Sequence, residues 1–193
     1  FPRLSVREDT GAKIIENLTG RKAEVLIDPT LMLSKEEWKK LSADNKITEK
    51  DYILTYFLGG RDEKIDEDLK KYSKELDTKV YNLLDYSQPD IYTSDPCEFV
   101  NLIDNAKLVV TDSFHACVFS FIFKKPFLLY NRIGKSDMMS RMDTFLKKFK
   151  LERKYIFSKE KNELLECEYE QGYEILKQEQ KKVYKFLEDC VKN

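Results

Sequence analysis

Histidine is almost absent from this sequence, since His115 is its single representative among 193 residues. The four cysteines, at positions 97, 117, 167 and 190, include no Cys-x-x-Cys pair. Because zinc sites draw on closely spaced Cys and His ligands, we expect no metal centre. Cys97, Cys117 and Cys190 fall in helix-like segments, where we expect buried thiols of a cytoplasmic protein.

Long apolar runs and an excess of one charge are also lacking. No run approaches the ~20 apolar residues of a membrane helix, so we expect no membrane span. The 34 Lys and Arg residues nearly balance the 35 Asp and Glu residues, which argues against a general nucleic-acid-binding protein. The chain enters a strand-like pattern within its first seven residues and has no initial Met. We therefore expect a fragment of a longer protein.

What is present is a regular alternation of short apolar runs and helical patterns. Strands are predicted at 3–6, 23–27, 52–58, 79–84, 108–111 and 127–130, and helices at 10–18, 35–41, 63–76, 95–103, 116–123, 141–149 and 168–191. Thr10 and Ser34 are predicted N-caps. Strands joined by helices of this length favour right-handed crossovers and a parallel sheet. We expect one Rossmann-like, doubly wound α/β domain over residues 1–193, with the long helix 168–191 packed across the edge of its sheet.

His115 lies where the apolar run 108–111 ends and a helical pattern begins. Open α/β sheets bind ligands at such junctions. Polar residues follow other strands too, and in one parallel sheet these ends meet at a single crevice; the candidates are Ser5, Arg7, Glu8, Asp28, Thr30, Gly59, Gly60, Arg61, Thr111, Asp112 and Ser113. Helix N-termini in that crevice would favour an anion, and Arg7 and Arg141 would add bidentate contacts.

Most of these residues also have a purely structural explanation. His115, Asp112 and Ser113 are placed to cap the helix that follows them. Arg7 and Glu8 are placed to form a surface ion pair.

Two further segments are weak evidence for a site. Asp28-Pro29-Thr30 has the composition of a turn. Gly59-Gly60 has no third glycine at dinucleotide-binding spacing.

Several segments together resemble the polysaccharide pyruvyl transferase family. The strongest match is Asn105–His115, with its Val109-Val110-Thr111-Asp112-Ser113-Phe114-His115 run; the others are Ser5–Glu8, Asp28–Leu33, Tyr52–Tyr56, Pro96–Phe99, Lys125–Phe127 and Ser140–Met142. Their order and spacing are more specific than any one segment. Members of the family resemble two-domain GT-B glycosyltransferases, and this chain is similar to the second domain only. The resemblance therefore implies a missing N-terminal half and no activity for this piece alone.

The resemblance also implies a reaction in polysaccharide biosynthesis. A pyruvyl group passes from phosphoenolpyruvate to two hydroxyls of a saccharide acceptor, forming a ketal and releasing phosphate. The donor carries a carboxylate and a phosphate, for which Arg7, Arg141 and the helix starting near Ser113 are candidate ligands. Ser5 and Gly59 are further candidates for substrate binding. The scheme requires no cofactor and no metal.

The same resemblance suggests catalytic roles for three residues. His115 would transfer a proton to the methylene carbon or hold the departing phosphate. Glu8 or Asp112 would orient His115 or take a proton from the attacking hydroxyl. Some family members have Arg where this chain has Ser113, so the donor contacts at this position differ.

Two other functions stay open at this point. One is a GT-B glycosyltransferase domain that binds a nucleotide sugar. The other is a non-catalytic binding domain that retains the fold.

Overall fold

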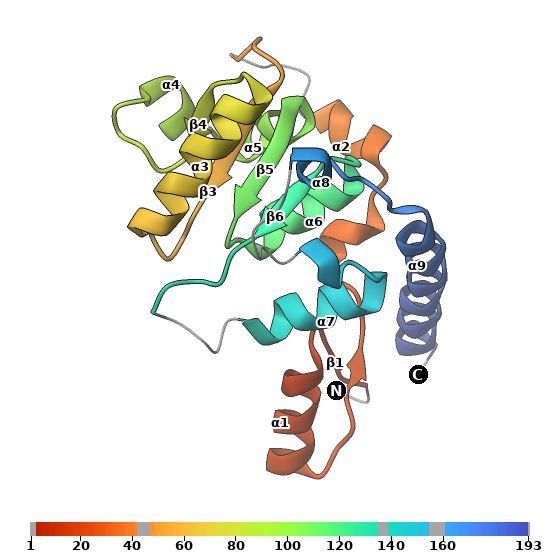
Figure 1. Cartoon of the computed structure of the whole chain (residues 1–193). Helices are drawn as coiled ribbons and strands as arrows, with labels where there is room; N and C mark the ends of the chain where they lie inside the picture. Colours follow the sequence, from red (N-terminus) through yellow and green to blue (C-terminus); the bar gives the residue numbers. More distant parts are fainter. Residues whose placement is uncertain (1–2, 42–46, 135–138, 155–160, 193) are drawn as a thin grey trace. The chain divides into compact units, whose positions relative to one another are not determined.

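The computed structural model describes residues 3–41, 47–134, 139–154 and 161–192. The chain divides into two compact units, which are described separately. The first unit comprises residues 1–33, 137–152 and 169–193, and the second comprises residues 34–136 and 153–168. In both units every described strand pair is parallel, and helices connect the strands (Figure 1). The predicted Rossmann-like α/β class is therefore confirmed, while the single-domain boundary 1–193 stays a prediction.

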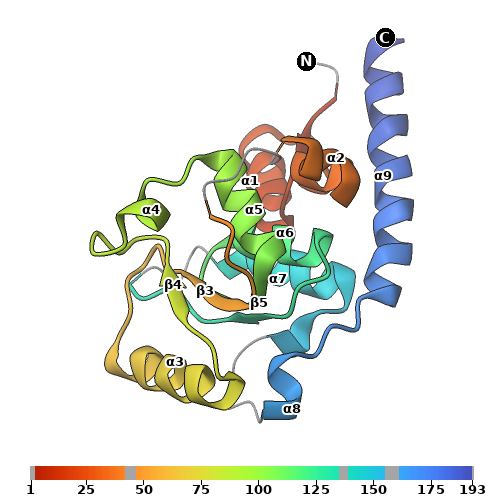
Figure 2. The same ribbon diagram turned by 90° about the horizontal axis from the view of Figure 1, so that it is seen from above.

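The second unit contains a four-stranded sheet of order β4-β3-β5-β6. Its strands are β3 (Tyr52–Tyr56), β4 (Val80–Asn82), β5 (Ala106–Thr111) and β6 (Phe127–Leu129). Helix α3 (Glu63–Leu76) covers one face, and α5 (Pro96–Asn105) and α6 (Phe114–Ile122) cover the other (Figures 1 and 2). The short helices are α2 (Lys35–Leu41), α4 (Pro89–Tyr92) and α8 (Lys161–Leu164), and a 3₁₀ helix, η3, covers Glu152–Lys154.

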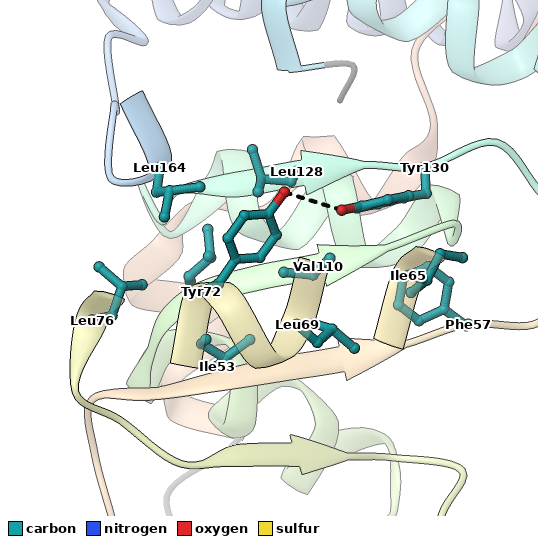
Figure 3. Close-up of a cluster of buried hydrophobic side chains, with 11 residues drawn as sticks. Ile53, Phe57, Ile65, Leu69, Tyr72, Leu76, Val110, Leu128, Tyr130 and Leu164 are labelled. Atoms are coloured by element: carbon teal, nitrogen blue, oxygen red, sulfur yellow. Dashed lines mark hydrogen bonds between the residues drawn. The ribbon is translucent and has the colours of Figure 1, made fainter. Parts of the chain in front are cut away.

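The core under α3 follows directly from the sequence pattern. Apolar side chains three and four residues apart place Ile65, Leu69, Tyr72 and Leu76 on one helix face, and all four are buried. They pack on Ile53, Val110 and Leu128 of the sheet, and the hydroxyls of Tyr72 and Tyr130 lie 3.2 Å apart (Figure 3). Burial of each such side chain contributes about 1.5–3 kcal/mol. The Asp62 carboxylate accepts the Ile65 N–H at 2.9 Å, which explains why the helix begins at Glu63 as predicted.

The first unit contains a two-stranded parallel sheet of β1 (Ser5–Val6) and β2 (Glu24–Val25). Its helices are α1 (Asp9–Thr19), the 3₁₀ helix η1 (Pro29–Met32), α7 (Met139–Phe149) and α9 (Glu170–Val191). Helix α9 lies along this small sheet, since Lys182 Nζ donates to the Val25 carbonyl at 2.9 Å and Gln180 Nε2 donates to the Leu31 carbonyl at 2.7 Å.

The expectation of one sheet carrying all the strand ends is wrong. Among the described residues, β1 and β2 pair only with each other, and both edges of β3 and of β5 are occupied by other strands. The apolar run 23–27 yields a strand of only two residues, Glu24–Val25, and Asp28 caps η1 three residues after it. The ends of β1 and β2 therefore belong to a different sheet from the end of β5.

Two smaller predictions are also wrong. Helix α1 begins at Asp9 rather than after Thr10, with Glu8 at the N-cap position and an acidic side chain at the positive end of the helix dipole. The Thr10 hydroxyl instead hydrogen-bonds the hydroxyl of Ser140 at the start of α7. All three of Cys97, Cys117 and Cys190 were expected to be buried, but Cys97 is exposed and Cys190 is half-buried, so the expectation holds for Cys117 alone.

Within the described ranges, no helix has the length and apolarity needed to cross a bilayer.

Candidate functional site

The carboxyl ends of β3 and β5 mark the point where the strand order of the second unit reverses. From β3 the chain passes to β4 on one side and then returns to β5 on the other. In open α/β sheets ligands bind in the crevice outside such neighbouring strand ends. The second unit therefore has a topologically expected ligand site beside Tyr56 and Thr111, the last residues of these two strands.

Asp112 joins the two strand ends at this point. Its carboxylate accepts hydrogen bonds from the backbone N–H groups of Leu58 at 2.7 Å and Gly59 at 2.8 Å. The neighbouring Thr111 hydroxyl donates to the Tyr56 carbonyl at 2.5 Å. The Asp112 side chain is only 1% exposed. The carboxylate thus holds the loop after β3 in place and does not cap α6.

Arg132 completes this buried arrangement and was missed from the sequence. Its Nε donates to the Asp112 carboxylate at 3.3 Å, and its Nη2 donates to the Asp112 carbonyl at 3.1 Å. Gly59 leaves room for it, since a Cβ there would lie 2.6 Å from Arg132 Cγ. The Gly59 N–H already donates its hydrogen bond to Asp112. The predicted contact of Gly59 with a substrate stays a prediction.

Helix α6 begins immediately after this arrangement. Ser113 occupies the N-cap position, but its side chain makes no capping hydrogen bond. The first N–H groups of a helix lack intrahelical acceptors and carry the positive end of the dipole, which favours an anion. His115 lies in this first turn, with its ring 5.3 Å from that of Phe114. Cys117, two residues further on, is fully buried, and burial raises the pKa of its thiol, so it is unsuited to act as a nucleophile.

A cavity of about 460 Å³ opens over the start of α6. Ser113, His115 and Phe119 line it on the α6 side, and residues that follow β3 and β4 line it opposite, with α4 and the start of α5 between them. His115 and Ser113 are thus the two predicted site residues that the structure brings to one cavity within the second unit. Asp112 supports the same strand end from behind, through Leu58 and Gly59.

Arg7 pairs with Asp28 in the first unit, and not with Glu8 as the surface ion-pair explanation assumed. The distance from Arg7 Nη1 to Asp28 Oδ2 is 2.6 Å. The Asp28 side chain is only 3% exposed, whereas that of Arg7 is 46% exposed. The Thr30 N–H and hydroxyl also donate to Asp28, at 3.1 and 2.8 Å. Asp28 therefore caps η1 through Thr30 and, with the same carboxylate, holds the Arg7 guanidinium in place.

The other residues predicted to act in catalysis or to bind substrate also belong to the first unit. Ser5 lies in β1 and is exposed, Glu8 is half-buried before α1, and Arg141 is half-buried in the first turn of α7. Their predicted contact with the same ligand as His115 stays a prediction.

The pairing of Asp28 predicts an acid-dependent loss of stability in the first unit. Burial opposes ionisation of Asp28, but the bonds from Arg7 and Thr30 outweigh it and hold the carboxyl pKa below its usual value. A lowered pKa stabilises the folded state fully above the unfolded pKa of about 3.9, and this contribution is lost as pH falls through the folded value. In Arg7→Ala we expect the pKa of Asp28 to rise. Carbon-detected NMR titration of the Asp28 carboxyl measures it, and an unchanged pKa would contradict the role of this ion pair.

Within the described residues, no three His, Cys, Asp or Glu side chains gather as they would around a metal ion. The predicted absence of a metal from the reaction stays a prediction.

Comparison with known proteins gives one match. The family model of polysaccharide pyruvyl transferase matches residues 1–132. No curated protein and no solved structure matches the chain. The matched range covers more than half of the sequence and includes β1 to β6, Asp112, Ser113, His115 and Arg132.

Proposed function

Since the chain belongs to the polysaccharide pyruvyl transferase family, we propose that it binds phosphoenolpyruvate and takes part in transferring the pyruvyl group to a sugar. In this reaction C2 of the donor forms bonds to two sugar oxygens, and its bond to the phosphate oxygen breaks. Of the two hydroxyl protons released, one moves to the methylene carbon and the other leaves with the phosphate. The product is a cyclic ketal on the saccharide.

The observation that carries this proposal is the position of His115 and Ser113 in one cavity at the start of α6. The open N–H groups of the first turn favour the phosphate or the carboxylate of the donor. The Ser113 hydroxyl, which makes no capping bond, adds a donor for the same anion. Histidine is the side chain type best suited to exchange protons near physiological pH, and His115 is the one histidine of the sequence. It is therefore suited to carry a proton between the sugar hydroxyl and the methylene carbon.

Asp112 has a positioning role in this proposal. Its carboxylate is occupied by two backbone N–H groups and Arg132, which leaves it poorly placed to accept a proton from a hydroxyl. Through these bonds it holds the end of β3 beside the end of β5. It thereby fixes the backbone that carries Ser113 and His115. Because the site is already ordered before the donor binds, less free energy is lost in ordering it on binding.

Phosphoenolpyruvate should raise the melting temperature of the chain. A ligand at 100 times its Kd stabilises the folded state by about 2.7 kcal/mol, and each kcal/mol raises Tm by roughly 2–4 °C at this chain length. We therefore expect a shift of about 5–10 °C with phosphoenolpyruvate, measured by differential scanning fluorimetry. Inorganic phosphate should give a smaller shift, because it lacks the carboxylate. A shift with a nucleoside diphosphate and none with phosphoenolpyruvate would contradict the proposal and favour a nucleotide-sugar site.

A further inference from the structure

The proposed reaction uses a second proton-transferring group besides His115. Two sugar hydroxyls lose their protons, while the methylene carbon gains one proton and the departing phosphate gains the other. A step that adds a proton to carbon and removes one from a hydroxyl uses one acid and one base. The Asp112 carboxylate is occupied by two backbone N–H groups and by Arg132, so the base is another residue.

Asp95 carries a carboxylate in the cavity beside His115. Among the described residues that line this cavity, it is the one residue with a carboxylate side chain. Its Oδ1 accepts the Glu98 N–H at 2.8 Å, because Asp95 is the N-cap of α5. Its Oδ2 makes no hydrogen bond with a described residue, and the residue is exposed. The capping bond therefore fixes the orientation of the carboxylate and leaves Oδ2 available to accept a proton.

Aromatic packing holds the starts of α5 and α6 beside each other. Helix α5 ends where β5 begins and α6 begins where β5 ends, so both helices start at the carboxyl edge of the sheet. Phe99 follows Asp95 by four residues and Phe119 follows His115 by four residues, a spacing that keeps each pair on one helix face. The rings of Phe99 and Phe119 meet edge to face, with centroids 5.9 Å apart. This contact joins the faces of α5 and α6 that carry Asp95 and His115, and both residues line one cavity.

We propose that Asp95 is a catalytic residue of the pyruvyl transfer and the proton-transfer partner of His115. This inference rests on the proposed function, since it completes the acid–base chemistry of the same reaction. It gives the Asp95 carboxylate a role beyond the cap of α5.

The protons balance over two steps. In the first step a sugar hydroxyl attacks C2 and gives its proton to Asp95, while protonated His115 gives a proton to the methylene carbon. C2 then carries a methyl group, the carboxylate, the phosphate and one sugar oxygen. In the second step the other hydroxyl displaces the phosphate from C2 and gives its proton to His115, and Asp95 gives its proton to the departing phosphate. Both residues return to the protonation states in which they began.

Asparagine at position 95 separates catalysis from capping, because it caps a helix as well as aspartate does but cannot act as a base. We expect Asp95→Asn to melt close to the temperature of the unchanged chain. Since His115 is the only histidine, its ring protons are readily assigned by NMR, and they should shift in this variant. Asp62→Asn is the matched control, because Asp62 caps α3 through the Ile65 N–H and does not line the cavity. The ring signals should stay in place in the control.

The rate of transfer tests catalysis itself. The full-length protein is given phosphoenolpyruvate with methyl glucopyranoside, methyl galactopyranoside or methyl mannopyranoside, and phosphate release is followed by phosphorus NMR. Asp95→Asn should release phosphate about 10²–10⁴-fold more slowly, with unchanged affinity for phosphoenolpyruvate. Asp95→Glu keeps a carboxylate but is not a favoured N-cap. It should therefore melt at a lower temperature than Asp95→Asn and yet react faster.

Three results would overturn the role of Asp95 alone. They are an equal rate in Asp95→Asn and in the unchanged protein, His115 ring signals that do not move in Asp95→Asn, and rates that follow the melting temperatures of the two variants. The proposed function fails separately. An unchanged protein that binds no phosphoenolpyruvate, or that binds it and releases no phosphate with any of the three sugars, would refute that function.

Discussion

Replacing Asp112 with alanine should lower the free energy of unfolding by about 3–5 kcal/mol. The change leaves the N–H groups of Leu58 and Gly59 without their acceptor, and it leaves the Arg132 guanidinium buried without its charge partner. Among the described residues, Asp112 is the one side chain that accepts hydrogen bonds from these groups. Urea denaturation followed by circular dichroism measures the loss.

Asp66→Ala is the matched control for this prediction. Asp66 also pairs with an arginine, Arg61, at 3.1 Å, but its side chain is 47% exposed. Exposed pairs contribute about 0–1 kcal/mol, so this variant should unfold at nearly the same urea concentration as the unchanged chain. Equal losses for the two variants would show that Asp112 does not hold the strand ends together.

Replacing His115 with glutamine should lower the rate of pyruvyl transfer by about 10²–10⁴-fold, the usual contribution of a general acid or base. Affinity for phosphoenolpyruvate should change little, because the helix N-terminus and Ser113 remain. Loss of kcat with little change in donor binding indicates an interaction made in the transition state. The readout is the release of phosphate from phosphoenolpyruvate by the full-length protein in the presence of a sugar acceptor.

The pH dependence of the rate adds a second readout for His115. It is the only histidine of the chain, so any limb of the profile that it causes between pH 5 and 8 should disappear in the glutamine variant. A variant that keeps the full rate and the same profile would remove His115 from the chemistry. A variant that keeps the rate but loses donor affinity would make it a binding residue instead.

Local signals in the sequence were sufficient to predict most helices and strands of the fold. The helix at Glu63–Leu76 was predicted to the residue, because the spacing of its apolar residues is a local signal. The Ser34 cap of α2 was also predicted, and Glu37 N–H donates to its hydroxyl at 3.2 Å. The short helices α4 and α8 were missed, since four residues carry too little periodicity.

Strand pairs and hydrogen-bond partners that are distant in the sequence could not be predicted from local signals. The division of the strands into two sheets depends on pairing between segments, which alternation of apolar residues does not encode. Asp112 was among the predicted site residues, but its hydrogen-bond partners could not be predicted, because they lie 53 and 54 residues upstream and 20 residues downstream. The structural alternative for Arg7 paired it with its neighbour Glu8, although its partner is Asp28, 21 residues away.

The most direct test of the account is a proton–nitrogen NMR titration of the chain with phosphoenolpyruvate. If the start of α6 holds the donor, the amide signals of Phe114, His115 and Ala116 should show the largest shifts. Smaller shifts are expected at Ser94 and Tyr92, which line the same cavity. Shifts confined to other segments, or equal shifts with a nucleoside diphosphate at the same concentration, would contradict it.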